Sequence, residues 1–128
     1  MQLVVVNMAQ RGFWRWTREI RLAVSPDRFL AYIRDANFVL TDSFHGTAFS
    51  LIYKRRFLSF VTSTVSGRIY SLLSAIGLGD RMVPGVNLDE EKFKLLMQPP
   101  SDSAYCNLID QKEDSIAWLR GAIDAASK

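Results

Sequence analysis

The sequence predicts an α/β fold: a parallel sheet with flanking helices. Short, continuous apolar runs alternate with segments of helical period along most of the chain. Such alternation is typical of parallel strands joined by crossover helices. A length of 128 residues is sufficient for one domain with a real core. We therefore expect a single α/β domain over residues 1–128.

The first half of the chain supplies two strands and two helices. Leu3 to Val6 reads as a strand buried on both faces. Ser25-Pro26-Asp27 provides an N-cap, a proline at the first helical position and an acidic first turn, so a helix should run from there to Ala36. Phe38 to Leu40 is a second buried strand, and the next helix should end around Tyr53.

The second half should be mostly helical after one more strand. Apolar residues at helical spacing from Ile69 to Ile76 indicate an amphipathic helix, ended by Gly77-Leu78-Gly79. The other expected elements are a strand at 57–61, a short edge strand at Met82 and Val83, a helix at 89–97 with Phe93, Leu96 and Met97 inward, and a last helix from about Leu108 to Ala125.

Composition limits the class of protein. The chain is 48% hydrophobic and 23% charged with a net charge of +3, which permits a polyanionic partner without requiring one. Its one cysteine, Cys106, allows no internal disulfide, so a reducing compartment is expected, and we interpret the thiol as a packing group. The apolar runs are too short for a transmembrane segment. These features predict a cytoplasmic protein.

The most informative segment joins the second strand to the helix after it. Thr41-Asp42-Ser43 ends the apolar run, and His45, the only histidine, follows with Gly46 and Thr47. In open α/β folds, ligands bind past the carboxyl ends of strands. A helix N-terminus at that place offers free N–H groups and a partial positive charge, which suit a phosphate or carboxylate. The segment therefore predicts an anion site.

Each residue of this segment also has a structural interpretation. Asp42 and Ser43 are good N-caps whatever the function. A lone histidine near a helix start is often a capping or solvated residue. Gly46 is also explained by close helix–strand packing, and Thr47 by the polar face of the helix. The residues alone leave both interpretations open.

With this motif in place, the chain resembles the C-terminal part of the polysaccharide pyruvyl transferase family. The resemblance covers most of residues 25–125. It implies a two-domain fold like that of B-type glycosyltransferases, with Rossmann-like halves. This chain would then be the C-terminal fragment, and an N-terminal domain would be missing. The segments that carry the resemblance are 25–30, 35–40, 41–50, 57–60, 68–73, 77–81 and 115–119.

The resemblance implies transfer of a pyruvyl group from phosphoenolpyruvate to a sugar of a cell-surface or exopolysaccharide glycan, forming a pyruvate ketal. The acceptor would be a glycan or a lipid-linked sugar, which would place the enzyme at the inner face of the membrane. His45 takes the catalytic role, with no cofactor and no metal. Arg68 matches a basic donor-binding residue about twenty positions later in the family. The implied donor-binding residues are Ser43, His45, Gly46, Thr47 and Arg68.

The chemistry of these residues fits that donor. Phosphoenolpyruvate is a small, multiply charged anion, so its site needs positive charge and N–H donors. Helix N-termini after Leu40 and near Ser66 would converge if both lie at the carboxyl edge of the sheet. Arg68 would pair bidentately with phosphate or carboxylate. A bound anion would favour the protonated form of His45, as needed to protonate the enol carbon or neutralise the leaving phosphate.

Other functions remain open. A B-type glycosyltransferase domain using a nucleotide-sugar donor would share the architecture, although no Gly-x-Gly-x-x-Gly is present. Residues 11–21 interleave arginine with aromatic residues, a pattern suited to single-stranded nucleic acid or an anionic membrane surface, yet no nucleic-acid motif accompanies it. We interpret that stretch as a loop near the sugar acceptor and expect no nucleic-acid partner. The last alternative is an inactive glycan- or anion-binding fragment.

Overall fold

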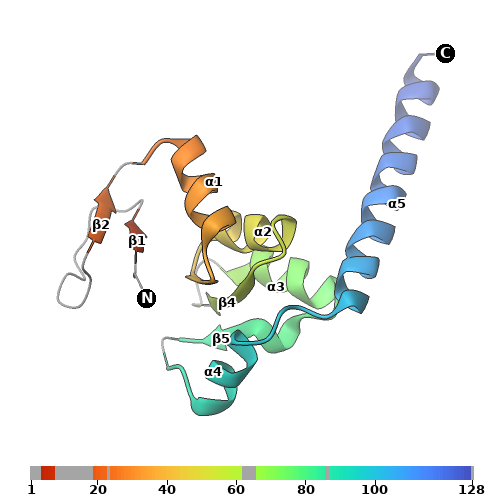
Figure 1. The fold of residues 1–128 in the computed structure, drawn as a ribbon. Helices are drawn as coiled ribbons and strands as arrows, with labels where there is room; N and C mark the ends of the chain where they lie inside the picture. Colours follow the sequence, from red (N-terminus) through yellow and green to blue (C-terminus); the bar gives the residue numbers. More distant parts are fainter. Residues whose placement is uncertain (1–3, 8–18, 23, 62–65, 86, 128) are drawn as a thin grey trace.

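The computed structural model describes residues 4–7, 19–22, 24–61, 66–85 and 87–127. Its centre is a three-stranded parallel sheet in the order β3-β4-β5 (Figure 1). The predicted α/β class with a parallel sheet and flanking helices is confirmed. The three strands are β3 (Phe38–Thr41), β4 (Arg56–Val61) and β5 (Met82–Pro84).

Strand β4 carries the core because its side chains are buried on both faces of the sheet. Phe57 points to one face and Leu58 to the other, and both are fully buried. The Phe57 face packs against α2 (Phe44–Ile52), α3 (Ser66–Ala75) and the start of α5 (Asp102–Ala126), whereas the Leu58 face packs against α4 (Glu90–Leu96). The predicted strand at 57–61 and the two predicted helices are confirmed.

Helix α1 (Pro26–Asp35) begins and ends where the sequence predicted. Ser25 is its N-cap, Pro26 occupies the first helical turn, and Ala36 is its C-cap. The helix packs on α2, where the rings of Phe29 and Phe49 meet edge to face with centroids 6.4 Å apart. This contact sets α1 beside the helix that carries His45.

Strand β3 is less buried than predicted. Phe38 and Val39 are half-buried, and Leu40 is 43% exposed, so the expectation of a strand buried along its length is wrong. The reason is topological: β3 lies at the end of the strand order, and α4 (Glu90–Leu96) covers β4 and β5 on the face of Leu40.

The C-terminal third differs from prediction in two further ways. Helix α5 (Asp102–Ala126) begins well before the expected start near Leu108, because Ser101 caps it by accepting a hydrogen bond from the Ala104 N–H. In α4, only Leu96 of the three residues expected inward is buried; Phe93 is 52% and Met97 45% exposed. The 3₁₀ turn η1 (Gly79–Arg81) leads directly into β5, the predicted edge strand.

A separate two-stranded parallel sheet lies near the N-terminus. It pairs β1 (Val4–Asn7) with β2 (Glu19–Leu22). The strand predicted at residues 3–6 is thus found at β1, whereas β2 was not predicted. Most of the arginine- and tryptophan-rich stretch at 11–21 lies outside the described residues. Within the described chain, no helix combines the length and apolar character of a membrane span.

Candidate functional site

The candidate site lies at the carboxyl edge of the parallel sheet. Helix α2 follows β3 after two residues, and α3 is the next helix after β4. Because β3 and β4 are parallel, their carboxyl ends meet at one edge, and both helices begin there. Two helix N-termini therefore face the same region, as the sequence predicted (Figure 1).

Side chains cap the start of α2 and leave two amides free. Ser43 is the N-cap, and its Oγ accepts a hydrogen bond from the Gly46 N–H at 3.4 Å. Thr41 Oγ1 in turn accepts from the Ser43 N–H at 3.1 Å. Among the described residues, the amides of Phe44 and His45 have no hydrogen-bond partner. These two N–H groups are available to an anion.

Phe44 connects the two predicted cationic residues of the site. The exposed His45 ring lies edge-on to the Phe44 ring, with centroids 5.9 Å apart. The Arg68 guanidinium carbon of α3 lies 5.1 Å from the centre of the same ring. The structure therefore brings His45 and Arg68 to one aromatic side chain, although 23 positions separate them in the sequence. Such a cation–π contact orients the guanidinium group.

Gly46 lies beneath this surface and is buried. A Cβ at this position would stand 2.3 Å from Thr41 Oγ1 and 3.0 Å from Thr41 Cβ, closer than side chains tolerate. Glycine is therefore required for α2 to approach the end of β3. This geometry supports the packing interpretation of Gly46, while its role in donor binding stays a prediction.

Thr47 is also buried, and its hydroxyl group is fully engaged. Thr47 Oγ1 donates to the Ser43 carbonyl at 3.0 Å and is 2.7 Å from Ser59 Oγ of β4. One turn later, Ser50 donates to the Gly46 carbonyl at 2.7 Å. The Thr47 side chain thus faces the sheet and fixes the turn, whereas His45 and Arg68 remain at the surface.

The charges around the turn suit an anion. The first turn of α2 contains no acidic residue, and Arg68 supplies a permanent positive charge beside it. Asp42, exposed just before the N-cap, is the nearest acid in the sequence. Within the described part of the chain, no three histidine, cysteine, aspartate or glutamate side chains gather as metal ligands do.

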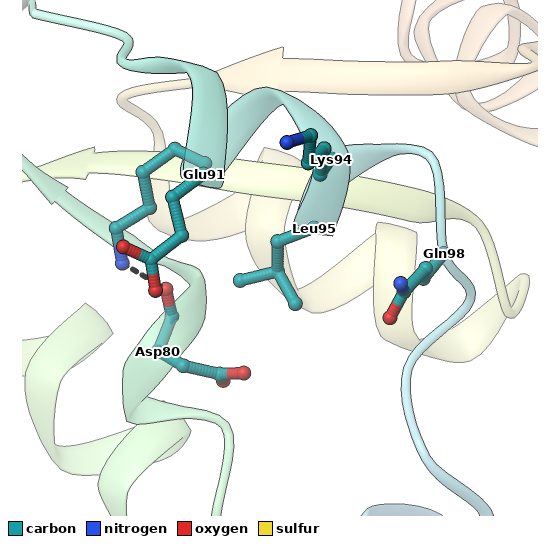
Figure 2. A pocket seen from close by; sticks show the side chains of 6 residues that line it. Asp80, Glu91, Lys94, Leu95 and Gln98 are labelled. Carbon is teal, nitrogen blue, oxygen red and sulfur yellow. Dashed lines mark hydrogen bonds between the residues drawn. The ribbon is translucent and has the colours of Figure 1, made fainter.

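A cavity away from the candidate site contains none of the predicted site residues. Figure 2 shows this cavity of about 260 Å³ between α4 and η1. The Lys92 amine donates a hydrogen bond to the Asp80 carbonyl across it. The lining residues are Asp80, Glu91, Lys92, Lys94, Leu95 and Gln98.

The fold is α/β, and the start of α2, with its two free amides and the nearby Arg68, lies at the carboxyl edge of the sheet. Residues 8–64 match the family model described as polysaccharide pyruvyl transferase. The match includes β3, the capped turn and α2, so the resemblance seen in the sequence is confirmed over this segment; Arg68 lies outside it. The match indicates polysaccharide pyruvyl transferase activity in general, with a glycan acceptor. No curated protein and no solved structure matches the chain significantly.

Proposed function

We propose that this chain binds phosphoenolpyruvate at the start of α2 and takes part in transferring its pyruvyl group to a sugar. The observation that carries the proposal is the convergence of His45 and Arg68 on Phe44, next to two free amides. Phosphate and carboxylate groups are bound by this combination of N–H donors and positive charge. The family match supports the reaction class.

Each group has a distinct role in the proposed reaction. The amides of Phe44 and His45 hold one anionic group of the donor, and Arg68 pairs with the other. His45, in its protonated form, supplies the proton for the enol carbon or neutralises the departing phosphate. Ser43 holds the turn in place and borders the donor.

The reaction balances without an added oxidant or reductant. Two hydroxyl oxygens of the sugar form bonds to the central carbon of the donor while its bond to the phosphate oxygen breaks. One hydroxyl proton ends on the new methyl group and the other on phosphate. The products are a pyruvate ketal and inorganic phosphate.

The wider setting is also part of the proposal. We propose a second, N-terminal domain completing a two-domain enzyme of the B-type glycosyltransferase architecture. A lipid-linked or exopolysaccharide sugar as acceptor would place that enzyme at the inner face of the membrane. No cofactor is needed for the reaction as written.

The proposal predicts donor binding that depends on His45 and Arg68. Binding of phosphoenolpyruvate, measured by calorimetry and by the rise in melting temperature, should weaken roughly ten- to a hundredfold in His45→Ala and in Arg68→Ala, as expected for losing one charge-assisted hydrogen bond. Arg68→Lys should recover part of the loss, because it keeps the charge without the bidentate geometry.

Arg28→Ala is the matched control, since Arg28 is exposed on α1 and outside the turn. It should bind the donor like the unmodified chain. Equal affinity in His45→Ala, Arg68→Ala and the control would remove the proposal. Stabilisation by a nucleoside diphosphate in place of phosphoenolpyruvate would favour the nucleotide-sugar glycosyltransferase. Donor binding without transfer to any acceptor would favour the binding fragment.

A further inference from the structure

Helix α5 is anchored to the rest of the described chain only near its beginning. Ala104 and Leu108 pack in the main core, and Asn107 and Gln111 donate hydrogen bonds to carbonyls at the end of α3. The helix continues to Ala126 and projects away from the sheet (Figure 1). Isolated helices shorter than about 12–15 residues are marginal in water, so a partner surface would stabilise this projecting part.

The projecting part carries an apolar stripe with coiled-coil spacing. Its four members are separated by seven, three and four positions, which places them on one face of the helix, with Lys112 at the position between the first two. All are exposed where a packed stripe would be buried: Ile109 (54%), Ile116 (39%), Leu119 (52%) and Ile123 (55%).

Two charged residues flank this stripe on one side. Glu113 and Arg120 are both exposed and seven positions apart, so they occupy equivalent places in successive heptads. If two α5 helices pack antiparallel, Glu113 of each copy meets Arg120 of the other, and one two-fold axis makes both ion pairs. In a parallel arrangement, the residues facing Glu113 and Arg120 are Leu108 and Ser115, which offer no charge.

We propose that a second copy of this chain covers the stripe, with the two α5 helices antiparallel. The register set by the ion pairs packs Ile116 of each copy on Leu119 of the other at the centre of the contact. The outer face of α5 carries Asp110, Asp114 and Asp124, which opposes binding to an anionic lipid surface. The inference is independent of the proposed function.

The first test is the oligomeric state of the full chain, measured by sedimentation at tens of micromolar protein. A dimer is expected. Ile116→Asp should weaken it at least tenfold, because two carboxylates would enter the centre of the contact. Asp114→Arg, on the outer face, is the matched control and should leave the dimer unchanged. A monomer at that concentration, or a dimer insensitive to Ile116→Asp, overturns the proposal.

Charge reversal tests the ion pairs between Glu113 and Arg120. This test is valid even if the Ile116→Asp variant fails to fold. Glu113→Arg and Arg120→Glu should each weaken the dimer, because each places like charges opposite one another at two places. The double variant restores both pairs and should recover the original affinity. If the double variant is as weak as the single ones, Glu113 and Arg120 do not face each other.

The single cysteine of the chain measures the direction of the helices. Contrary to the packing role expected from the sequence, Cys106 is exposed on α5, and it can carry a spin label without substitution. In the antiparallel register, the two Cys106 positions are 23 residues apart along the helix axis, or about 35 Å. A parallel pair would bring them to about the distance between helix axes, roughly 10 Å. A short distance between the labels overturns the antiparallel arrangement.

Discussion

Gly46 is the residue at which α2 comes closest to the end of β3. A Cβ there would lie 2.3 Å from Thr41 Oγ1, and the helix and strand would have to separate to accept it. Gly46→Ala should therefore lower the free energy of unfolding by about 1–3 kcal/mol, the usual cost of overpacking. Urea denaturation of the full chain measures this change.

Gly121→Ala is the matched control for this prediction. Gly121 lies inside α5, and a methyl group added there would have no neighbouring atom within 4 Å, so alanine meets open space. It should leave stability unchanged or raise it by up to about 1 kcal/mol, because alanine is the better helix former. Equal losses of unfolding free energy in Gly46→Ala and Gly121→Ala would show that the close approach of α2 to β3 does not cause the destabilisation.

The sequence predicted where residues lie in the turn better than it predicted their tertiary contacts. The capping pattern offered Asp42 and Ser43 as N-caps, of which the structure uses Ser43, and it correctly predicted His45 in the first helical turn. The burial of Thr47 was not predictable, because it depends on which face of α2 meets Ser59 of β4. The part played by Phe44 was missed for a similar reason: the ring becomes a shared contact only once α3 folds beside it.

At the scale of elements, one buried hydrogen bond joins α2 to the sheet. Thr47 Oγ1 and Ser59 Oγ are 2.7 Å apart, and both residues are fully buried. Thr47→Val keeps the shape of the side chain but leaves Ser59 Oγ and the Ser43 carbonyl without this partner. Loss of about 1–3 kcal/mol in the free energy of unfolding is expected, from the penalty for an unsatisfied buried group.

Ser59→Ala is expected to cost less than Thr47→Val, because Thr47 still donates to the Ser43 carbonyl. The double variant should lose less than the sum of the two single losses, since either change already breaks the shared bond. Chemical denaturation of the unmodified chain, the two single variants and the double variant gives the four free energies of this double-mutant cycle. Strict additivity would mean that the two hydroxyl groups are not coupled.

Elements with clear capping residues and a regular apolar face were predicted well, and the others were not. Helix α1 had a serine cap, a proline start and a regular apolar face, and its ends were correct. Strand β2 alternates charged and apolar residues, but over only four positions, which is too short a pattern to identify a strand from the sequence. The first turns of α5 are mostly polar, and the apolar spacing that marks the helix begins only near Leu108.

At the scale of the whole molecule, Arg81 and Tyr105 lie where the sheet, η1 and α5 meet. Arg81 is 2% exposed and donates to the Phe57 carbonyl at 3.3 Å and to the Gln98 carbonyl at 2.9 Å. Burial lowers the pKa of the Arg81 guanidinium group from its usual high value. These bonds connect η1 to β4 and to the segment that leads into α5.

The Tyr105 hydroxyl is buried at this junction and has no hydrogen-bond partner among the described residues. Burial raises the pKa of Tyr105 above its ordinary value, because the phenolate would be poorly solvated. The folded chain therefore holds this proton more tightly than the unfolded chain does. The resulting contribution to stability is fully present below about pH 10 and is lost as pH rises through the raised pKa.

Tyr105→Phe separates the cost of burying a hydroxyl group without a partner from the effect of the raised pKa. At neutral pH the variant should be as stable as the unmodified chain or more stable by about 1 kcal/mol, because it removes a buried polar group without a partner. Above about pH 10 its advantage should grow, since phenylalanine has no proton to lose. Urea denaturation at both pH values measures the difference, and Tyr70→Phe, at a side chain that is 61% exposed, is the control. A clear loss of stability in Tyr105→Phe at neutral pH would show that the hydroxyl group has a partner at the base of α5.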